Sequence, residues 1–424
     1  MSDPTGPASP SRDWLDRIDA ADLVFLGSAC GEPQTLVDQL VAERHRWRGL
    51  RLLTGLQGSP ARYAQADCAE NFSLTTFMAT RATREAFATG RADHIPSSVY
   101  QTARLLDSGR VRIDVALVQV SPPDADGFCS LGVSVAYNRA AVRAAKTVIA
   151  EVNQQMPRTL GDGMIHISEF DAVVHTDRPV LTVAVPEPSA PMAAIGASVA
   201  EFVDDGASVQ VGVGGISDAV WSALAERNDL SVHTGAAGDA VMRLLKSGVI
   251  KGRKGENPVP AVTAGQLIGS RELYEFADEN PDFRLAQPNV THNPAVMGGL
   301  GSFVSVISAL QVDLRGQINS EVVGGTQVAG VGGALDFATG AGLAERGCSI
   351  VALPSTAGGK HSRVVSRLPD GVVTLPATLV DVVVTEYGVA DLRGLGLHAR
   401  REALTAIAAP QFRDQLIEEA NAPW

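Results

Sequence analysis

Short apolar runs alternate with longer amphipathic stretches along most of the chain. Runs rich in β-branched and other apolar residues predict buried strands at 22–27, 50–53, 112–120, 208–212, 348–354 and 379–385. Amphipathic stretches predict helices at 140–146, 192–203 and 217–225, the last with Ser217 or Asp218 as its N-cap. Because strands alternate with helices, the pattern predicts mostly parallel sheets.

One segment interrupts this alternation and is the best candidate for a linker. PEPSAP, at 186–191, is rich in proline, and similar strand–helix patterns lie on both sides of it. A chain of 424 residues is long enough to form two cores. We therefore expect two α/β domains, 13–186 and 187–424, with the functional site between them. The polar, Pro-rich segment 1–12 is expected to be a disordered tail.

Composition excludes several classes of partner. The net charge of −12 argues against a nucleic-acid ligand, which favours a basic surface. No apolar run is long enough to cross a membrane, and the N-terminus lacks the apolar region of a signal peptide. The four cysteines are widely spaced and form no CxxC, which is typical of buried thiols in a reducing compartment. We expect a cytoplasmic protein with no metal site, since the eight histidines show no metal-binding spacing.

Glycine-rich turns after predicted strands are the candidate binding sites. QVGVGG at 210–215 precedes a predicted helix, so its N–H groups could hold a phosphate, although tight turns also use glycine for conformational reasons. It matches neither the Walker nor the GxGxxG pattern. Further clusters lie at 329–337 and 354–363. Lys360, His361 and Arg363 at the last cluster either contact phosphates or form a solvated basic turn. A phosphate-bearing ligand is therefore expected.

Two strand ends are candidate positions for catalytic groups. The segment 230–239 (LSVHTGAAGD) is predicted to be a short strand running into a turn, where an α/β enzyme would place its nucleophile. Small residues occupy 234–238, and only His233 and Asp239 could titrate nearby. Glu386 ends the predicted strand 379–385 and is either a structural partner of an arginine or a site residue.

Longer motifs carry a resemblance to a known family. They cover nearly the whole chain from about residue 20, in order: 120–135 (VSPPDADGFCSLGVSV), 150–162, GVGGISDAV, 310–321 (LQVDLRGQINSE), AGVGGALDF, PSTAGG, VVTEYGVADLRG and 409–416. In these motifs the chain resembles the acetyl-CoA hydrolase/transferase family, which includes 4-hydroxybutyrate and butyrate–acetate CoA-transferases.

The resemblance implies two CoA-transferase-type α/β domains and a CoA site in the second. Matching the motifs places CoA, as a substrate and not a permanently bound cofactor, on Gln210, Val211, Gly212, Val213 and Gly214. The second glycine loop would add Gly330, Gly332 and Gly333 near the thioester carbonyl, where backbone N–H groups suit an oxyanion. Lys360 is a further candidate for contact with CoA. We also expect a homodimer or a higher homo-oligomer.

One departure from the family pattern affects the mechanism. Members of the family carry a glutamate that attacks the acyl-CoA and then holds CoA as a glutamyl thioester, and this position corresponds to Gly235. Glycine has no side chain, so it cannot form that intermediate. The candidates for a relocated catalytic group are Glu386, Glu321, His233 and His361. By the same matching, Gly235→Glu would be expected to restore weak transfer.

Three interpretations remain open. The enzyme cleaves or transfers an acyl-CoA with water or another acceptor activated by a relocated base. Alternatively, the small residues 235–237 open the pocket to a bulkier acyl group, and the enzyme catalyses carbon–carbon hydrolysis or acyl transfer to an amine or alcohol. In the third interpretation the chain is a non-catalytic acyl-CoA-binding protein.

Overall fold

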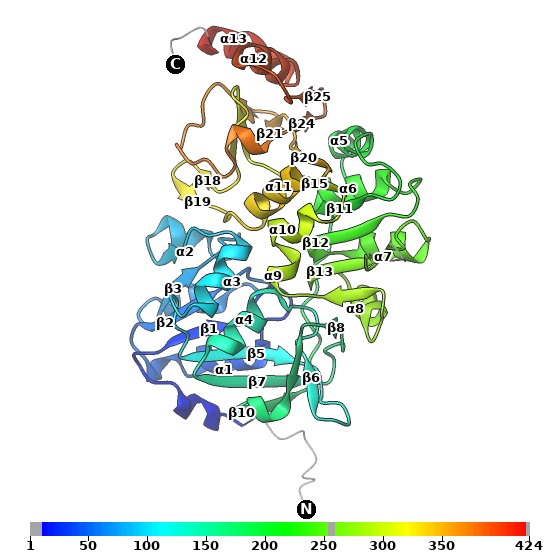
Figure 1. Ribbon diagram of the computed structural model, residues 1–424. Coiled ribbons are helices and arrows are strands. Elements are labelled where there is room, and N and C mark those ends of the chain that lie inside the picture. Colours follow the sequence, from blue (N-terminus) through cyan, green and yellow to red (C-terminus); the bar gives the residue numbers. More distant parts are fainter. Residues whose placement is uncertain (1–10, 253–258, 421–424) are drawn as a thin grey trace, which may run out of the picture.

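Two large, mainly parallel β-sheets organise the molecule, which is described by a computed structural model. The structure describes residues 11–252 and 259–420, so most of the predicted tail, residues 1–10, lies outside the described residues. In Figure 1 the N-terminal half (blue to cyan) forms the lower part and the C-terminal half (green to red) the upper part. The predicted α/β class with mostly parallel sheets is confirmed.

The first sheet contains seven strands, all parallel. Their order is β10-β7-β5-β1-β2-β3-β4. The bounds are β1 Leu23–Leu26, β2 Leu50–Thr54, β3 Phe72–Thr76, β4 Ala92–His94, β5 Val115–Val120, β7 Thr147–Asn153 and β10 Ala172–Thr176.

The second sheet contains nine strands in the order β25-β24-β20-β15-β11-β12-β13-β14-β8, and only the pair β24–β25 is antiparallel. Strand β8 comes from the N-terminal half and pairs with β14. The bounds are β8 Leu160–Gly161, β11 Ser208–Val211, β12 Ser231–Ala237, β13 Val262–Leu267, β14 Phe283–Leu285, β15 Ser302–Ser308, β20 Arg346–Ala352, β24 Val382–Thr385 and β25 Gly388–Asp391.

Helices connect the strands, as the parallel topology requires. Figure 1 shows α12 and α13 at the end of the molecule furthest from the first sheet. The helices are α1 Gln34–Ala42, α2 Arg84–Ala88, α3 Val99–Asp107, α4 Ala136–Ala144, α5 Ala190–Ala200, α6 Gly215–Ala223, α7 Asp239–Lys246, α8 Arg271–Ala277, α9 Pro288–Thr291, α10 Pro294–Gly298, α11 Ala334–Leu343, α12 Leu397–Ala406 and α13 Arg413–Ala420. The remaining short strands are β6 Phe128–Ser130, β9 Met164–His166, β16 Gln311–Asp313, β17 Ile318–Asn319, β18 Val322–Val323, β19 Thr326–Gln327, β21 Thr356–Ala357, β22 His361–Ser362 and β23 Val364–Val365.

Most predicted elements are present, with shifted ends. The predicted cap of α6 is wrong, because the helix begins at Gly215 with Gly214 as N-cap, before Ser217. A φ of 132° at Gly214, which glycine tolerates, lets the helix follow the turn directly. Strand β12 continues to Ala237, since Ala236 and Ala237 pair with Gln266 and Leu267. Gly235 therefore lies within the strand and not in the predicted turn.

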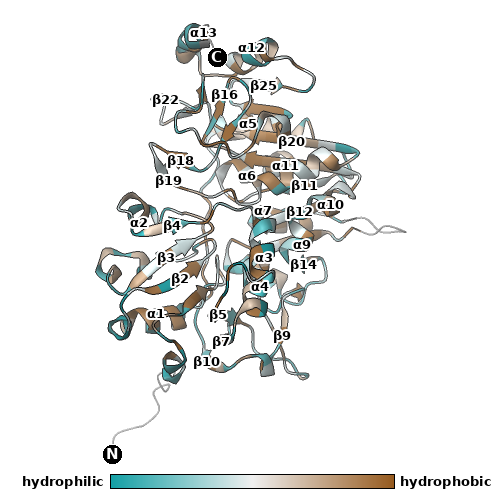
Figure 2. Ribbon diagram, turned by 60° about the vertical axis from the view of Figure 1, so that its left-hand side comes forward, coloured by the Kyte–Doolittle hydropathy of each residue, from teal (hydrophilic) through white to brown (hydrophobic). Residues whose placement is uncertain are grey.

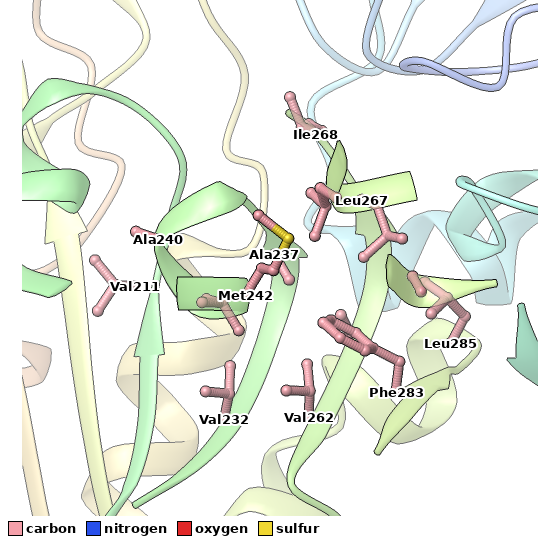
Figure 3. Close-up of a cluster of buried hydrophobic side chains, with 14 of the residues drawn as sticks. Val211, Val232, Ala237, Ala240, Met242, Val262, Leu267, Ile268, Phe283 and Leu285 are labelled. Atoms are coloured by element: carbon pink, nitrogen blue, oxygen red, sulfur yellow. The ribbon is translucent and has the colours of Figure 1, made fainter. Parts of the chain in front are cut away.

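Burial agrees with the apolar pattern. In Figure 2 hydrophobic residues colour the strands in the middle of both halves. Figure 3 shows Val232 and Ala237 of β12 packed near Val262 of β13 and Met242 of α7. The four cysteines are buried and unpaired, as predicted. Within 11–252 and 259–420, no helix has the length and apolar character needed to cross a membrane.

Backbone and side-chain hydrogen bonds join the two halves. The segment after β6 pairs with the end of β13, where Val135 N donates to Gly265 O at 3.1 Å. At the start of α3, Val99 N donates to Gly332 O at 3.0 Å. Asp336 of α11 accepts from Ser98 Oγ at 2.6 Å and from Tyr100 N at 3.1 Å. These contacts fix the second glycine loop against the N-terminal half. The exact boundary at 186/187 stays a prediction.

Replacing Asp336 with alanine should lower the stability of the protein. The buried Ser98 hydroxyl and the Tyr100 N–H would lose their acceptor, which costs about 1–3 kcal/mol. Asp336→Asn keeps one side-chain oxygen and should lose less. Urea unfolding of both variants, beside the exposed control Asp126→Ala, measures the effect. Equal unfolding midpoints for Asp336→Ala and the control would contradict this role.

Candidate active site

A cleft of 280 Å³ lies between the two halves and is lined by parts of both. Met78, Val99 and Tyr137 line it from the N-terminal half. The C-terminal half contributes the ends of β11 and β12 together with the starts of α6 and α11. The carboxyl ends of parallel strands are the usual place for a ligand in open α/β sheets. The cleft is therefore the candidate active site.

The first glycine loop turns from β11 into α6 at the edge of the cleft. Gln210, Gly212 and Val213 line the cleft. Hydrogen bonds hold the strand end: Ser305 Oγ donates to Gln210 Oε1 and Thr234 Oγ1 donates to Val211 O, both at 2.9 Å. The loop leads into the N-terminus of α6, whose free N–H groups and dipole favour a negative charge.

The second glycine loop leads into α11 at another side of the cleft. Gly332 has a φ of +55°, and a Cβ built there would lie 3.1 Å from Met78 Cε. Gly332, Gly333 and Ala334 line the cleft, and the Val99 N–H holds the Gly332 carbonyl. Two helix N-termini thus open into one cleft. Their N–H groups suit an oxyanion that develops on a thioester carbonyl.

The strand between these loops carries Gly235 where the family resemblance expects glutamate. Gly235 lines the cleft opposite His292, which lies between α9 and α10. A Cβ built on Gly235 would lie 2.8 Å from His292 Nε2 and 3.0 Å from Cε1. The imidazole therefore fills the space of a side chain at 235. Gly235 does not by itself enlarge the cleft, which removes the main support for a bulkier acyl group.

The two predicted carboxylate candidates lie outside the lining of the cleft. Glu386 accepts from the N–H and the Oγ of Ser355, both at 2.7 Å, so both of its oxygens hold the turn after β20. Glu321 is buried and accepts from Thr374 Oγ1 at 2.8 Å. Its Oε2 lies 4.0 Å from His94 Nε2 of the N-terminal half. Both carboxylates support loops in this conformation.

The other predicted residues divide between the cleft and its surroundings. His233 is buried behind the cleft, and its Nε2 lies 3.2 Å from Val290 O and 3.1 Å from Thr291 O. Lys360 and His361 line a separate hollow beside α13. The cleft brings together five of the predicted CoA-binding residues: Gln210, Gly212, Val213, Gly332 and Gly333. The remaining four, which do not line it, are Val211, Gly214, Gly330 and Lys360.

His233 should make stability depend on pH in the acid range. Burial lowers its pKa from 6.5 to about 4, although the two carbonyls act in the opposite direction. The unfolded chain binds a proton below pH 6.5 and the folded chain does not, so stability is lost as pH falls toward 4. Between neutral pH and about pH 5, wild type should lose about 2 kcal/mol more than His233→Gln, which keeps an N–H donor. Urea unfolding at both pH values tests this. Equal losses in the two proteins would contradict it.

Sequence reasoning missed His292, although it is the histidine that lines the cleft. Among the described lining residues there is no Asp, Glu, Lys, Arg or Cys side chain. Burial raises the pKa of Tyr137 further above its ordinary value, so its hydroxyl stays protonated. Among the lining residues, His292 is the one whose residue type ordinarily titrates near neutral pH. A single sequence gives no signal that places His292 beside Gly235, 57 positions earlier. Residues 11–252 and 259–420 contain no group of three His, Cys, Asp or Glu suited to a metal ion.

The fold and the cleft define an α/β protein with two mainly parallel sheets, in which two glycine loops and two helix N-termini that suit an anion meet at one cleft. Comparison with known proteins agrees. The models of the acetyl-CoA hydrolase/transferase N-terminal and C-terminal domains match residues 11–185 and 269–420. The chain is 40% identical to 4-hydroxybutyrate coenzyme A transferase of Clostridium kluyveri over 407 residues, covering 96% of this chain and 95% of the relative.

Solved structures give the same result. RipA from Yersinia pestis superposes with a TM-score of 0.91 at 30% identity, covering 96% of this chain and 95% of that one. A 4-hydroxybutyrate CoA-transferase from Porphyromonas gingivalis gives a TM-score of 0.80 at 34% identity with the same coverage. The chain belongs to the acetyl-CoA hydrolase/transferase family, and it is an enzyme of that class.

Proposed function

We propose that this enzyme cleaves or transfers an acyl group or CoA at the thioester of an acyl-CoA, without the usual glutamyl-CoA intermediate. One observation carries the proposal: both glycine loops and Gly235 line the cleft, while none of the lining side chains within 11–252 and 259–420 is a carboxylate. The loops support CoA binding and oxyanion stabilisation. The missing carboxylate leaves no covalent nucleophile of the family's kind at the thioester.

The substrate would lie with its thioester between Gly235 and the second glycine loop. N–H groups at the starts of α6 and α11 would stabilise negative charge on the pyrophosphate and on the carbonyl oxygen. The acceptor is a carboxylate, water or another small nucleophile. Water or another protic acceptor would attack the thioester directly and release CoA. A carboxylate acceptor would first give a mixed anhydride and free CoA thiolate, which would then attack the acceptor carbonyl and release the original acyl group as a carboxylate, with no enzyme-bound glutamyl thioester.

A panel of thioesters tests the proposal. Acetyl-, butyryl-, succinyl- and 4-hydroxybutyryl-CoA would be incubated with the enzyme, with and without acetate. Release of free thiol without acetate identifies hydrolysis, and formation of acetyl-CoA from another thioester identifies transfer. CoA binding by calorimetry with no cleavage of any thioester would contradict the proposal and favour a binding protein.

We also propose a cytoplasmic homodimer or higher oligomer. Four unpaired buried cysteines support a reducing compartment. Light scattering of the purified protein tests the oligomeric state, and a monomeric mass would contradict it.

A further inference from the structure

His292 is held tightly between two glycines of facing elements. A Cβ on Gly235 would lie 2.8 Å from Nε2, and a Cβ on Gly333 would lie 2.8 Å from Cδ2. Neither position could carry a side chain unless the ring moved. The ring also contacts Phe337, with centroids 4.7 Å apart, and α9 before it packs against β12 and α3. The absence of side chains at Gly235 and Gly333 therefore leaves the space that the imidazole of His292 occupies.

The hydrogen bonds of Thr291 are compatible with a proton on Nδ1 of the His292 ring. His292 Nδ1 lies 2.8 Å from Thr291 Oγ1, and this hydroxyl donates to Gln287 O at 3.3 Å. When this hydroxyl uses its one proton on Gln287 O, Thr291 Oγ1 accepts from Nδ1–H. In this tautomer Nε2 keeps its lone pair toward Gly235, and within the part of the chain that the structure describes Nε2 makes no hydrogen bond.

A second histidine supports this geometry from behind. Val290 and Thr291 present their carbonyls to His233 Nε2, so that nitrogen donates to the backbone directly before His292. Burial lowers the pKa of His292 to about 3, with a smaller contribution from His233. The imidazole is therefore neutral across the physiological range, and Nε2 is a hydrogen-bond acceptor.

Building on the proposed function, we propose that His292 is a catalytic residue whose Nε2 binds and deprotonates the attacking group, so the enzyme selects a protic acceptor over a carboxylate. Water, an alcohol or an amine can donate a proton to a neutral imidazole nitrogen. A carboxylate has no proton to donate, and its lone pairs would face the lone pair of Nε2. The geometry favours hydrolysis or acyl transfer to an alcohol or amine over exchange with acetate.

For water the step balances without a further reactant. The water oxygen attacks the thioester carbonyl, and its proton passes to Nε2 as the new C–O bond makes the attacking oxygen acidic. The oxyanion is stabilised by backbone N–H groups at the second glycine loop. The C–S bond then breaks and the CoA sulfur takes the proton from the imidazolium, leaving a carboxylic acid, free CoA and neutral His292.

Substitution of His292 and chemical rescue test the proposal. With butyryl-CoA and 4-hydroxybutyryl-CoA, His292→Ala should lower kcat for thiol release by about 100-fold or more, while CoA binding measured by calorimetry should change less than about threefold. Added imidazole should recover part of kcat in His292→Ala, because the small base enters the space left by the ring. A purely structural role would give no rescue. His175→Ala, which removes an exposed histidine on β10, is the matched control.

The outcomes separate this proposal from the proposed function. Wild-type cleavage with unchanged kcat in His292→Ala would overturn the role of His292 alone. A lack of rescue by imidazole would also overturn it. So would a wild type that makes acetyl-CoA from acetate faster than it releases thiol to water, or faster than it makes hydroxamate from the amine hydroxylamine. A wild-type enzyme that binds CoA but cleaves no thioester would overturn both proposals.

Discussion

Gly235→Glu alone should give no measurable exchange of CoA between an acyl-CoA and acetate. The new Cβ would lie 2.8 Å from His292 Nε2, and the ring is enclosed by Gly333 and Phe337. Forcing a side chain into such a space costs about 1–3 kcal/mol and displaces the carboxylate. The sequence alone favours restored transfer in this variant, and the position of His292 reverses that expectation.

The double variant Gly235→Glu/His292→Ala should gain the exchange that the single variant lacks. Removing the ring frees the space above β12, so the carboxylate can reach a thioester near the second glycine loop. Misplacement by about 1 Å can cost roughly 100-fold, so we expect slow but measurable formation of acetyl-CoA. Gly235→Ala/His292→Ala, which lacks the carboxylate, is the control. Exchange in the Gly235→Glu single variant equal to that in the double variant would contradict the steric argument.

Gly212→Leu should weaken CoA binding by about 100-fold, or about 2.7 kcal/mol. A Cβ at Gly212 meets only Ser217 Oγ at 3.7 Å, and the backbone there is not left-handed, so the variant should fold. Because Gly212 lines the cleft, the added side chain would block the approach of the ligand to the loop.

Calorimetry with CoA measures this loss. Gly342→Leu is a matched control, since a Cβ there meets no atom within 4 Å and Gly342 is exposed on α11. The control should bind CoA as wild type does. Equal affinities for Gly212→Leu and Gly342→Leu would show that CoA does not bind at the first glycine loop.

The apolar pattern was enough to predict the sheets because parallel strands are buried on both faces. Runs such as 208–212 and 379–385 therefore stand out as β-branched stretches and form β11 and β24. Their ends were less predictable. Residues 377–379 form a 3-10 turn before β24, and α4 starts at Ala136, four residues before the predicted helix. Local composition does not determine where tertiary contacts end an element.

The positions of site residues were predictable only where residues close by in the sequence determine them. The first glycine loop follows β11 directly, so Gly212 could be placed at the end of a strand from the sequence pattern, whereas Gly332 was placed only by the family resemblance. A residue at a strand end has a predictable position but not a predictable partner. Ser355 donates hydrogen bonds to both oxygens of Glu386, and Thr374 donates one to an oxygen of Glu321. His292 reaches Gly235 only through the packing of α9 and α10, which no local pattern encodes.

We expect the thioester reaction of this enzyme to proceed without a glutamyl-CoA intermediate. Borohydride reduces an enzyme-bound glutamyl thioester to an alcohol, which mass spectrometry detects at the modified residue. The enzyme would be incubated with butyryl-CoA, treated with borohydride and digested, with Gly235→Glu/His292→Ala processed in parallel as the positive control. We predict no modified glutamate in wild type while thiol is released. A reduced Glu321 or Glu386 in wild type would contradict the account, because the nucleophile would then have moved and not been lost.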